Sequence, residues 1–586
     1  MRRYLFVLAL FVLPMAGQAA AEPYRYAGVE RIVAVGDIHG ALDEIVTVLQ
    51  GTGLIDEELN WSGGRAHLVS VGDLVDRGDR GREVMDLIRR LQSEAEAAGG
   101  AVHIVLGNHE VMNLTGDLRY VSEGDFARFG AEAPPGLPAG FLERRTAFAP
   151  DGEYGRWLLG QAIAVVVNDT LFVHGGVSSR LAGMSLEQIN AAAMHDVSRF
   201  AAGWHALLEA GQLTDTDDFD GIRARGAALA EHADDERLRR IGMDITEALD
   251  GLPYVPDGPL WYRGTARCHP YSETGVTDAV LDGLGARRVV IGHTPTHDRR
   301  ITSRKDGRVL KIDTGMNVAA YQGRPAALII EKDSVRAWYA GEGEAGIEAE
   351  PNRVWDRPYG MSDREIEDFL LSAEVTRMED LAGSKDGRRL VTLSSDGREL
   401  KAVFNANDSA PRVSEGRWTR ASDGADRYIH EVAAYRLDQL LELQMIPVSV
   451  QRRIGDEAGA LRLLVENGFW EYERRERQIP YYGDCDLQAQ YEMMGVLDVL
   501  ILNADPQLDL LRYDRYWTIW LMDQSGAFGT VTDVRAVLRR SGLRPSPQMA
   551  EALERITPED VQFLSEYLHH RQVRALVDRA ARLRAR

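Results

Sequence analysis

Residues 31–40 read RIVAVGDIHG, an apolar run that ends in Gly, Asp and His. The same form returns at 67–73 as HLVSVGD and at 102–108 as VHIVLGN. A short apolar, β-branched run that ends at a glycine is typical of a buried strand followed by a loop. The intervening stretches LDEIVTVLQ (42–50) and REVMDLIRRLQ (82–92) have helical periodicity. Strands and helices that alternate in this way indicate an α/β layered fold with polar loops at the strand ends.

The pattern continues beyond these residues. AIAVVVNDTLFVHGG (162–176) predicts two strands with a turn between them, and ARRVVIGH (286–293) and RVLKIDTG (308–315) predict two more. Between them, residues from about 180 to 255 are helical in pattern and acidic, which indicates a helical insertion over the strand ends. The sequence therefore predicts one α/β domain at 28–340.

Five short polar fragments stand at the ends of these strands: GDIHG (36–40), GDLVDRG (72–78), GNHE (107–110), HGG (174–176) and GHT (292–294). We expect them to meet at one edge of a sheet. Taken singly, each could be a helix cap or a structural histidine. Together they would form a cluster of carboxylates, imidazoles and an amide, which is costly to bury unless metal ions supply positive charge. Oxygen ligands mixed with imidazoles suit Mn, Fe or Zn better than Ca.

This set of fragments resembles the calcineurin-like metallophosphoesterases, and the GDLVDRG form resembles their phosphoprotein phosphatase superfamily. The resemblance covers about half of the chain and implies a layered β-sandwich with flanking helices. It also implies two divalent or trivalent metal ions as cofactors. The ligands that it implies are Asp37 and His39 at the first ion, Asp73 between the ions, and Asn108, His174 and His293 at the second.

The activity that the resemblance implies is hydrolysis of a phosphomonoester by a hydroxide that the metals generate. His109 would protonate the leaving group, and Asp76 would orient its ring. Arg77 would bind the phosphate, because a guanidinium matches two phosphoryl oxygens at once. Arg263, in the fragment PLWYRG, is the candidate for a second phosphate-binding arginine, with Arg267 behind it.

One position departs from the eukaryotic protein phosphatases of this superfamily. Leu106 stands where they have an arginine, directly before GNHE. This residue, the helical insertion and LWYRG are more similar to the bacterial Shewanella-like phosphatases. The expected substrate is therefore a phosphorylated compound, with phosphoproteins as one option. A phosphodiesterase or nucleotide hydrolase is the alternative, and a binding module without turnover is opposed by the intact ligand set.

The N-terminal residues and the net charge predict where the protein is located and which partners it does not bind. Arg2 and Arg3, a short apolar run and small residues up to Ala21 have the order of a secretory signal, with cleavage expected after Ala21. We therefore expect a secreted or periplasmic protein without stable membrane insertion after cleavage, and an uncleaved membrane anchor is the alternative. The formal net charge of −22 argues against nonspecific nucleic-acid binding.

The composition changes at 341–364, which is rich in Gly, Glu and Pro and predicts a linker to a second, α+β domain at 365–586. Cys268 and Cys485 are the two cysteines of the chain. Because they lie far apart in sequence and in different predicted domains, we expect no disulfide framework.

The second half faintly resembles atypical kinase folds of the HipA and secretory-pathway types, in which a strand lysine pairs with a helix glutamate. Lys401 and Glu431 stand in such positions, and Asp505 and Asp523 follow in the order of the catalytic and metal-binding aspartates. Pro506 departs from the pattern of those families. The readings left open are a kinase-like domain that binds substrate or nucleotide, a bifunctional phosphatase and kinase, and an ordinary structural ion pair.

Overall fold

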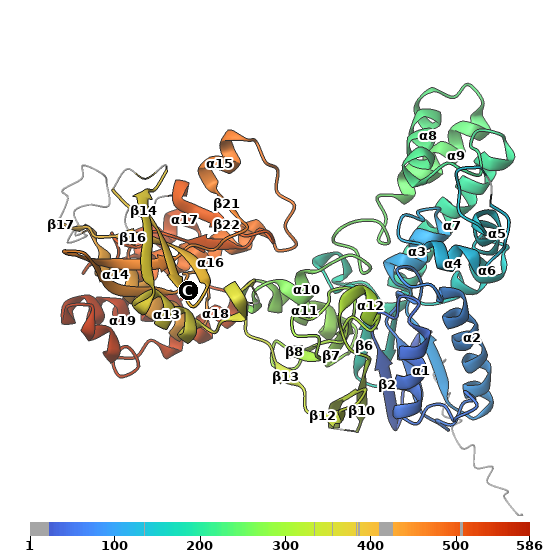
Figure 1. Ribbon diagram of the computed structural model, residues 1–586, viewed down its shortest axis with the longest axis horizontal. Helices are drawn as coiled ribbons and strands as arrows, with labels where there is room; N and C mark the ends of the chain where they lie inside the picture. Colours follow the sequence, from blue (N-terminus) through green and yellow to red (C-terminus); the bar gives the residue numbers. More distant parts are fainter. Residues whose placement is uncertain are drawn as a thin grey trace, which may run out of the picture.

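The computed structural model of the chain describes residues 23–133, 135–332, 334–353, 355–382, 384, 387–409, 426–503 and 508–586. The signal sequence predicted at 1–21 and Asp505 lie outside the described residues. Within the described ranges, no helix is both long enough and apolar enough to cross a membrane. The chain forms two lobes, which Figure 1 draws from blue to green and from yellow to red.

Two mixed sheets form the centre of the N-terminal lobe. The strands of the first are β2 (Arg31–Val35), β3 (His67–Ser70), β4 (Ala101–Ile104), β10 (Ala326–Glu331), β11 (Ser334–Tyr339) and β12 (Gly343–Ala345). The strands of the second are β1 (Arg25–Tyr26), β5 (Ala164–Val167), β6 (Thr170–Val173), β7 (Arg288–Ile291), β8 (Thr302–Arg304), β9 (Val309–Lys311) and β13 (Glu348–Ala349). Their orders are β12-β11-β10-β2-β3-β4 and β1-β5-β6-β7-β9-β8-β13.

The alternation of side chains along β2 shows how the layers pack. Ile32 and Ala34 point into a core that also contains Val290 of the second sheet. Val33 and Val35 point the other way, into a core with the helices α1 (Leu42–Gly51) and α2 (Gly81–Ala97). Because successive residues of a strand face opposite sides, an unbroken apolar run is what a strand buried on both faces requires. The predicted α/β sandwich with flanking helices is confirmed.

One expectation about the strand ends is wrong. The five polar fragments do not share one sheet edge, because β2, β3 and β4 belong to the first sheet whereas β6 and β7 belong to the second. The fragments meet where the ends of the two sheets converge. The apolar pattern identifies a buried strand but contains no information on which sheet the strand joins.

Helices surround the sandwich, and three of them form the segment predicted as an insertion. These are α7 (Leu186–Glu209), α8 (Phe219–His232) and α9 (Glu236–Ala248), with a small core of their own around Trp204 and Ile245. The remaining helices of this lobe are α3 (Asn108–Leu114), α4 (Glu123–Ala127), α5 (Phe141–Ala147), α6 (Glu153–Leu158), α10 (Gly264–Arg267), α11 (Pro270–Gly283) and α12 (Val318–Tyr321). In Figure 1, α8 and α9 project at the top right, and α7 is labelled below them beside α4, α5 and α6.

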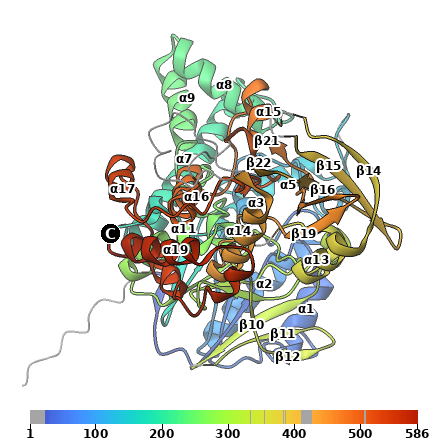
Figure 2. The same cartoon turned by 90° about the vertical axis from the view of Figure 1, so that its left-hand side faces the viewer.

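The C-terminal lobe faces the viewer in Figure 2. Besides a three-stranded sheet of β21 (Phe469–Trp470), β22 (Leu511–Tyr513) and β23 (Ile519–Leu521) and a strand pair of β17 (Asp408–Ser409) and β18 (Asp426–Arg427), it contains a five-stranded antiparallel sheet. Its strands, in order, are β14 (Glu374–Asp380), β15 (Arg389–Ser395), β16 (Arg398–Asn405), β20 (Glu457–Leu463) and β19 (Ser449–Ile454). The helices α13 (Asp363–Ser372), α14 (Tyr428–Leu441), α16 (Leu487–Ile501), α18 (Pro547–Ala552) and α19 (His570–Arg584) share its core. Within the segment predicted as a linker, β12 and β13 pair with β11 and β8 of the N-terminal lobe.

The ion pair expected from the kinase resemblance does not form. Lys401 is 44% exposed and lies 3.4 Å from Glu466. Glu431 is buried and accepts hydrogen bonds from Asn405 at 2.8 Å and Arg388 at 3.2 Å. Lys401 and Asn405 stand four residues apart on β16, so the strand presents an amide, and not an ammonium, to the buried glutamate.

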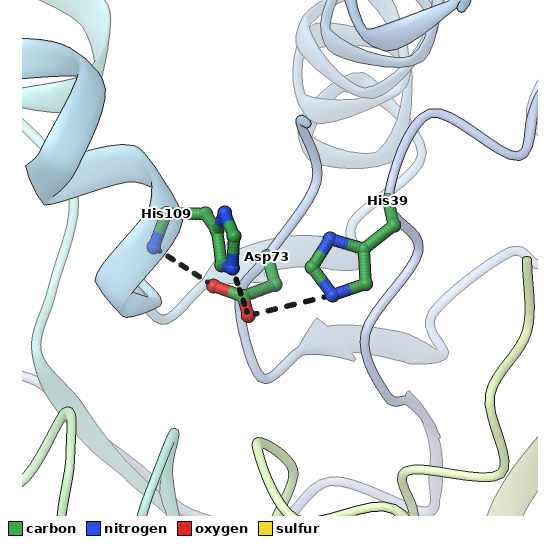
Figure 3. Close-up of side chains that lie close together, drawn as sticks. All are labelled: His39, Asp73 and His109. Carbon is green, nitrogen blue, oxygen red and sulfur yellow. Dashed lines mark hydrogen bonds and ion pairs between the residues drawn. The ribbon is translucent and has the colours of Figure 1, made fainter. Parts of the chain in front are cut away.

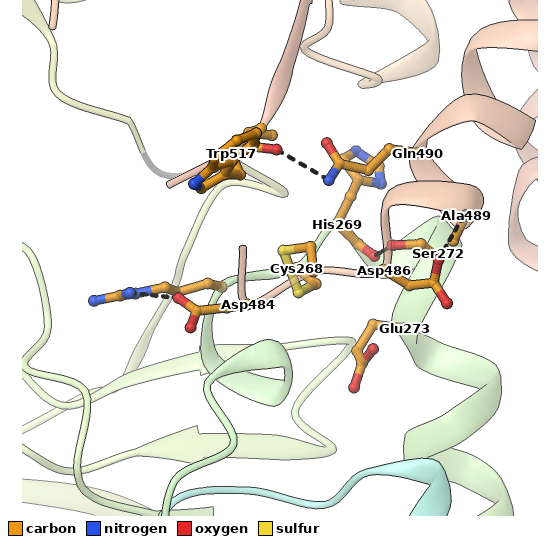
Figure 4. Close-up of a disulfide and its surroundings, with 12 residues drawn as sticks. Cys268, His269, Ser272, Glu273, Asp484, Asp486, Ala489, Gln490 and Trp517 are labelled. Carbon is orange, nitrogen blue, oxygen red and sulfur yellow. Dashed lines mark hydrogen bonds and ion pairs between the residues drawn. A yellow bond between two sulfur atoms is a disulfide. The ribbon is translucent and has the colours of Figure 1, made fainter. Parts of the chain in front are cut away.

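The expectation of no disulfide is also wrong. Cys268, directly after α10, is bonded to Cys485, which stands two residues before the start of α16, across a sequence separation of 217 residues (Figure 4). Their Cα atoms lie 5.3 Å apart, within the usual range for a disulfide. Tyr271 of α11 reaches across the same junction and donates to the Leu441 carbonyl at 2.7 Å. Only docking of the lobes brings the cysteines together, so their spacing in the sequence could not reveal the bond.

Candidate metal centre

Asp73 lies at the middle of a buried cluster between the two sheets. Its Oδ2 atom is 3.7 Å from His39 Nε2, 3.9 Å from His109 Nε2 and 3.4 Å from His174 Nε2. Figure 3 shows the first two rings on opposite sides of the carboxylate. Two groups of residues have the spacing of a metal site, His39 with Asp73 and His109, and Asp73 with His174 and His293. Asp73 is common to both, which is the arrangement that a carboxylate shared by two ions requires.

The imidazoles are held with one nitrogen free to bind a cation. His39 Nδ1 donates to the Val75 carbonyl at 3.0 Å, and His174 Nδ1 donates to the Val71 carbonyl at 2.7 Å. A hydrogen bond of this kind fixes the tautomer and leaves the Nε2 lone pair for a metal. Burial lowers the pKa of His39 to about 4, so its ring is neutral. His293 Nε2 is buried and has no hydrogen-bond partner among the residues that the structure describes.

Buried carboxylates supply the negative charge of the cluster. Asp37 accepts hydrogen bonds from the His293 backbone N–H at 3.0 Å. Burial, followed by the neighbouring carboxylates of Asp313 and Asp73, raises the pKa of Asp37 well above its usual range. Burial acts in the same direction on Asp73, but His174 and other imidazoles outweigh it and hold its pKa well below the usual range. Several carboxylates and neutral imidazoles in one buried place fit divalent cations.

Asn108 completes the predicted ligand set. Its Oδ1 atom lies 2.9 Å from His174 Nε2. Because Nδ1 of His174 carries the proton, both facing atoms are acceptors, and a shared cation would satisfy them. The structure thus brings all six predicted ligands together. They are Asp37, His39, Asp73, Asn108, His174 and His293.

The glycines of the fragments allow a close approach of backbone to ligand. A Cβ on Gly107 would lie 2.1 Å from Asp73 Oδ1, and a Cβ on Gly292 would lie 2.3 Å from Asp37 Oδ1. Neither distance is compatible with a side chain at these two positions. The backbone of the centre is also strained, since five candidate residues have left-handed φ values, each costing about 1–3 kcal/mol. They are His39 (49°), Asp73 (54°), Asp76 (69°), Arg77 (68°) and His293 (61°).

The pair predicted for proton transfer is in contact. His109 Nδ1 donates to Asp76 Oδ2 at 2.7 Å, and Asn113 Nδ2 donates to Asp76 Oδ1 at 3.0 Å. Burial opposes a charged His109 ring, but Asp73 and Asp76 outweigh it and raise its pKa to about 9. This ring is therefore fixed in orientation and favours the protonated form, as a general acid must.

Two arginines border the centre. Arg77 is exposed, and its Cζ atom lies 4.1 Å from the centre of the Tyr120 ring, which in turn lies 5.2 Å from the His109 ring. Arg263 Nη1 donates to the His293 carbonyl at 2.7 Å and to Thr294 Oγ1 at 3.0 Å. Both guanidiniums therefore lie beside residues of the candidate centre.

Two residues of the centre were missed by the sequence analysis. Glu110 accepts hydrogen bonds from the backbone N–H groups of Asp73 (2.8 Å), Leu74 (2.7 Å) and Gly107 (2.8 Å). It also caps α3 at the N3 position. Asp313 is buried beside Asp37. Both stand in stretches that the analysis had quoted, GNHE and RVLKIDTG, so their position at strand ends was the available signal.

Replacement of Glu110 by glutamine is expected to lower the free energy of unfolding by about 1–3 kcal/mol, because an amide NH₂ would face backbone donors and leave one of them unpaired. Urea denaturation of the metal-free protein measures this change. Glu96→Gln, at an exposed position, is the matched control. An unchanged denaturation midpoint for Glu110→Gln would show that Glu110 does not organise the loop.

A family model and several known proteins match the part of the chain that contains the candidate metal centre. Residues 30–297 match the family model described as calcineurin-like phosphoesterase. Over 346 residues the chain is 27% identical to Shewanella-like protein phosphatase 2 of Arabidopsis thaliana, which covers 53% of this chain and 77% of the relative. The crystal structure of a cold-active protein-tyrosine phosphatase from a psychrophilic Shewanella species is also similar. It has 27% identity, a TM-score of 0.42 and coverage of 55% of this chain and 82% of that one.

The other part of the chain has remote structural neighbours that are kinases. The crystal structure of the Golgi casein kinase is one of them, with 15% identity, a TM-score of 0.27 and coverage of 38% of this chain and 73% of that one. The relatives of the N-terminal lobe agree with the resemblance found in the five polar fragments.

Proposed function

The chain belongs to the calcineurin-like phosphoesterases, and on that premise we propose that it is an exported phosphatase that uses two metal ions to hydrolyse phosphomonoesters. That it is a metal-dependent phosphoesterase follows from its family. The observation that supports two ions is the position of Asp73, which is shared by two groups of residues with metal-site spacing. Mn, Fe and Zn are the proposed metals, because the ligands are carboxylates, imidazoles and an amide.

Each neighbouring side chain has a role in this reaction. Bound at these ligands, the cations would lower the pKa of a water molecule and offset charge on the phosphoryl group. Arg77 and Arg263 would bind the phosphoryl oxygens and hold the phosphorus in line with the attacking oxygen. His109 would donate its proton to the departing oxygen, while Asp76 holds the ring in that orientation.

Aromatic rings around the centre support aryl phosphates, including phosphotyrosine, as the preferred substrates. Tyr321 stacks on His39 with ring centres 5.4 Å apart, and Trp261 lies edge-on to His293 at 5.7 Å. Tyr120 adds a third ring beside Arg77. An aryl group of the substrate that paired with one of these rings would gain about 0.5–1.5 kcal/mol beyond its buried area. The similar Shewanella enzyme is named a protein-tyrosine phosphatase.

A panel of substrates tests this proposal. With manganese added, the purified chain is expected to have its highest kcat/KM on phosphotyrosine peptides and phenyl phosphate, lower values on phosphoserine peptides, and the lowest on a bis-aryl phosphodiester. Released phosphate is measured for the monoesters and released phenol for the diester. A diester hydrolysed as fast as the monoesters would favour the phosphodiesterase alternative instead.

Two observations support export. The N-terminus has the order of a secretory signal, and the Cys268–Cys485 disulfide is of a kind that persists in oxidising compartments outside the cytoplasm. Mass spectrometry of the protein recovered from the periplasm or medium of its source cells tests this proposal. An N-terminus at Glu22 is the expected result, whereas an intact Met1 in a cytoplasmic fraction would contradict export.

A further inference from the structure

The short helix α10 joins the candidate centre to the C-terminal lobe. At its N-cap position, Arg263 contacts the His293 carbonyl and Thr294. At its last position, Arg267 Nη1 donates to Asp484 Oδ2 of the other lobe at 2.6 Å. Cys268, the next residue, forms the disulfide with Cys485 (Figure 4). The phosphate-binding candidate and the attachment to the C-terminal lobe are therefore about one helical turn apart.

A further contact fixes the same end of the segment. His269 Nε2 lies 3.0 Å from the Glu442 carbonyl and donates to it. Burial lowers the pKa of this ring to about 3, so the contact is one of a neutral imidazole. The α10 segment is thus tied to the C-terminal lobe by an ion pair, a covalent bond and a hydrogen bond on three successive residues.

The other lobe balances the charge at the end of this segment. Arg263 and Arg267 are like charges close enough to interact, and the carboxylate of Asp484 opposes both, as those of Asp37 and Asp313 of the N-terminal lobe do at Arg263. The side chains of Arg267 and Asp484 are only 31% and 27% exposed, so solvent screens the pair incompletely.

The junction beside α10 is hollow. A cavity of about 90 Å³ separates Thr294 and Pro295, next to the candidate ligand His293, from Tyr516 and Trp355 on the other side. Packed side chains therefore do not fill the space between the centre and the C-terminal lobe at this place. The contacts of α10 are discrete links across it.

We propose that Asp484 is a positioning residue for the phosphatase reaction, which through Arg267 and α10 holds Arg263 where it binds the substrate phosphate, and that the disulfide keeps Asp484 in place. This inference rests on the proposed function. It assigns the C-terminal lobe a part in catalysis by the N-terminal lobe, without a reaction of its own.

The Asp484→Asn variant tests the ion pair. With p-nitrophenyl phosphate and manganese, KM is expected to rise roughly 10-fold while kcat changes less than about twofold, because loss of a contact made equally in the ground and transition states raises KM alone. Metal content should be unchanged. Asp484→Glu, which can keep the pair, is expected to restore most of the affinity. Asp356→Asn is the matched control, because Asp356 lines the same cavity but pairs with Arg515 of its own lobe.

A double-mutant cycle separates positioning from a general effect on stability. In an Arg263→Ala background, Asp484→Asn is expected to change KM by less than about twofold, since the residue that it positions is already absent. The same 10-fold rise in both backgrounds would overturn the inference, and so would an unchanged KM for the single variant.

Reduction of the disulfide gives an independent test. Dithiothreitol passes two electrons and two protons to Cys268 and Cys485, which become thiols while the reagent forms its own cyclic disulfide. KM of the wild-type chain should then rise to the value of the Cys268→Ser/Cys485→Ser variant, and the variant itself should not respond. An unchanged KM after verified reduction would contradict a role of the disulfide.

The outcomes for this inference and for the proposed function can be told apart. A wild-type chain that hydrolyses no phosphomonoester overturns both. An active wild-type chain whose variants have an unchanged KM overturns this inference only.

Discussion

Asp73→Asn is expected to lower kcat at least about 10³-fold and to remove most of the bound metal. Asp73 is the residue shared by the two metal-capable groups, so an amide in its place loses one negative charge and one ligand oxygen for both ions. In other active sites, loss of a single charge-stabilising group lowers kcat by about 10²–10³-fold. Loss of both ions would also remove the activation of water.

Metal analysis of the purified variant and its rate with added manganese measure both effects. Asp117→Asn is the matched control, because Asp117 is also a buried aspartate but pairs with Arg119 outside the centre. If the Asp73→Asn variant kept two equivalents of metal and more than about a tenth of the wild-type kcat, the result would show that Asp73 is not a ligand of the metals.

His109→Gln is expected to lower kcat by about 10²–10⁴-fold for an alkyl phosphate and much less for p-nitrophenyl phosphate. An alkoxide needs a proton as it departs, whereas p-nitrophenolate is stable without one. The ring donates to Asp76 at 2.7 Å and lies 3.9 Å from Asp73, so its orientation is fixed for donation to the departing oxygen.

Rates for a series of leaving groups, with metal content measured in parallel, distinguish two roles of this histidine. His109 also belongs to one metal-capable group. A variant that loses metal and loses rate equally on all substrates would identify His109 as a ligand and not as the acid. His195→Gln, on the exposed side of α7, serves as the control for the substitution itself.

Most residues of the candidate centre could be predicted from the sequence because its candidate ligands stand directly after predicted strands. Asp37, Asp73 and Asn108 each follow an apolar run within a few residues, and such runs form strands whose ends converge. Glu110 and Asp313 also stand just after predicted strands, but the sequence does not show which groups they contact, and their role depends on those contacts. Glu110 accepts from three backbone N–H groups, two of them 36 and 37 residues away in the chain.

The kinase resemblance shows the opposite case. Lys401 and Glu431 had the right order and the right elements, yet they do not meet. Lys401 and Asn405 lie an even number of residues apart on β16 and so face the same side of the strand, but Asn405 lies four residues further along it, where it meets the buried glutamate. The order of residue types along the chain is therefore weaker evidence for a contact than a polar fragment that directly follows a strand, because only the second pattern also gives the position of the residue on its strand.

The sequence by itself determined the sandwich, the six candidate ligands, the candidate acid His109 and the candidate phosphate-binding Arg77, because local hydrophobic patterns and short polar fragments specify these features. Only the tertiary structure decided that the fragments come from two sheets, that Cys268 and Cys485 are bonded, and that Asp484 pairs with Arg267. These three features depend on how sheets and lobes dock, and docking joins residues whose separation along the chain leaves no local pattern.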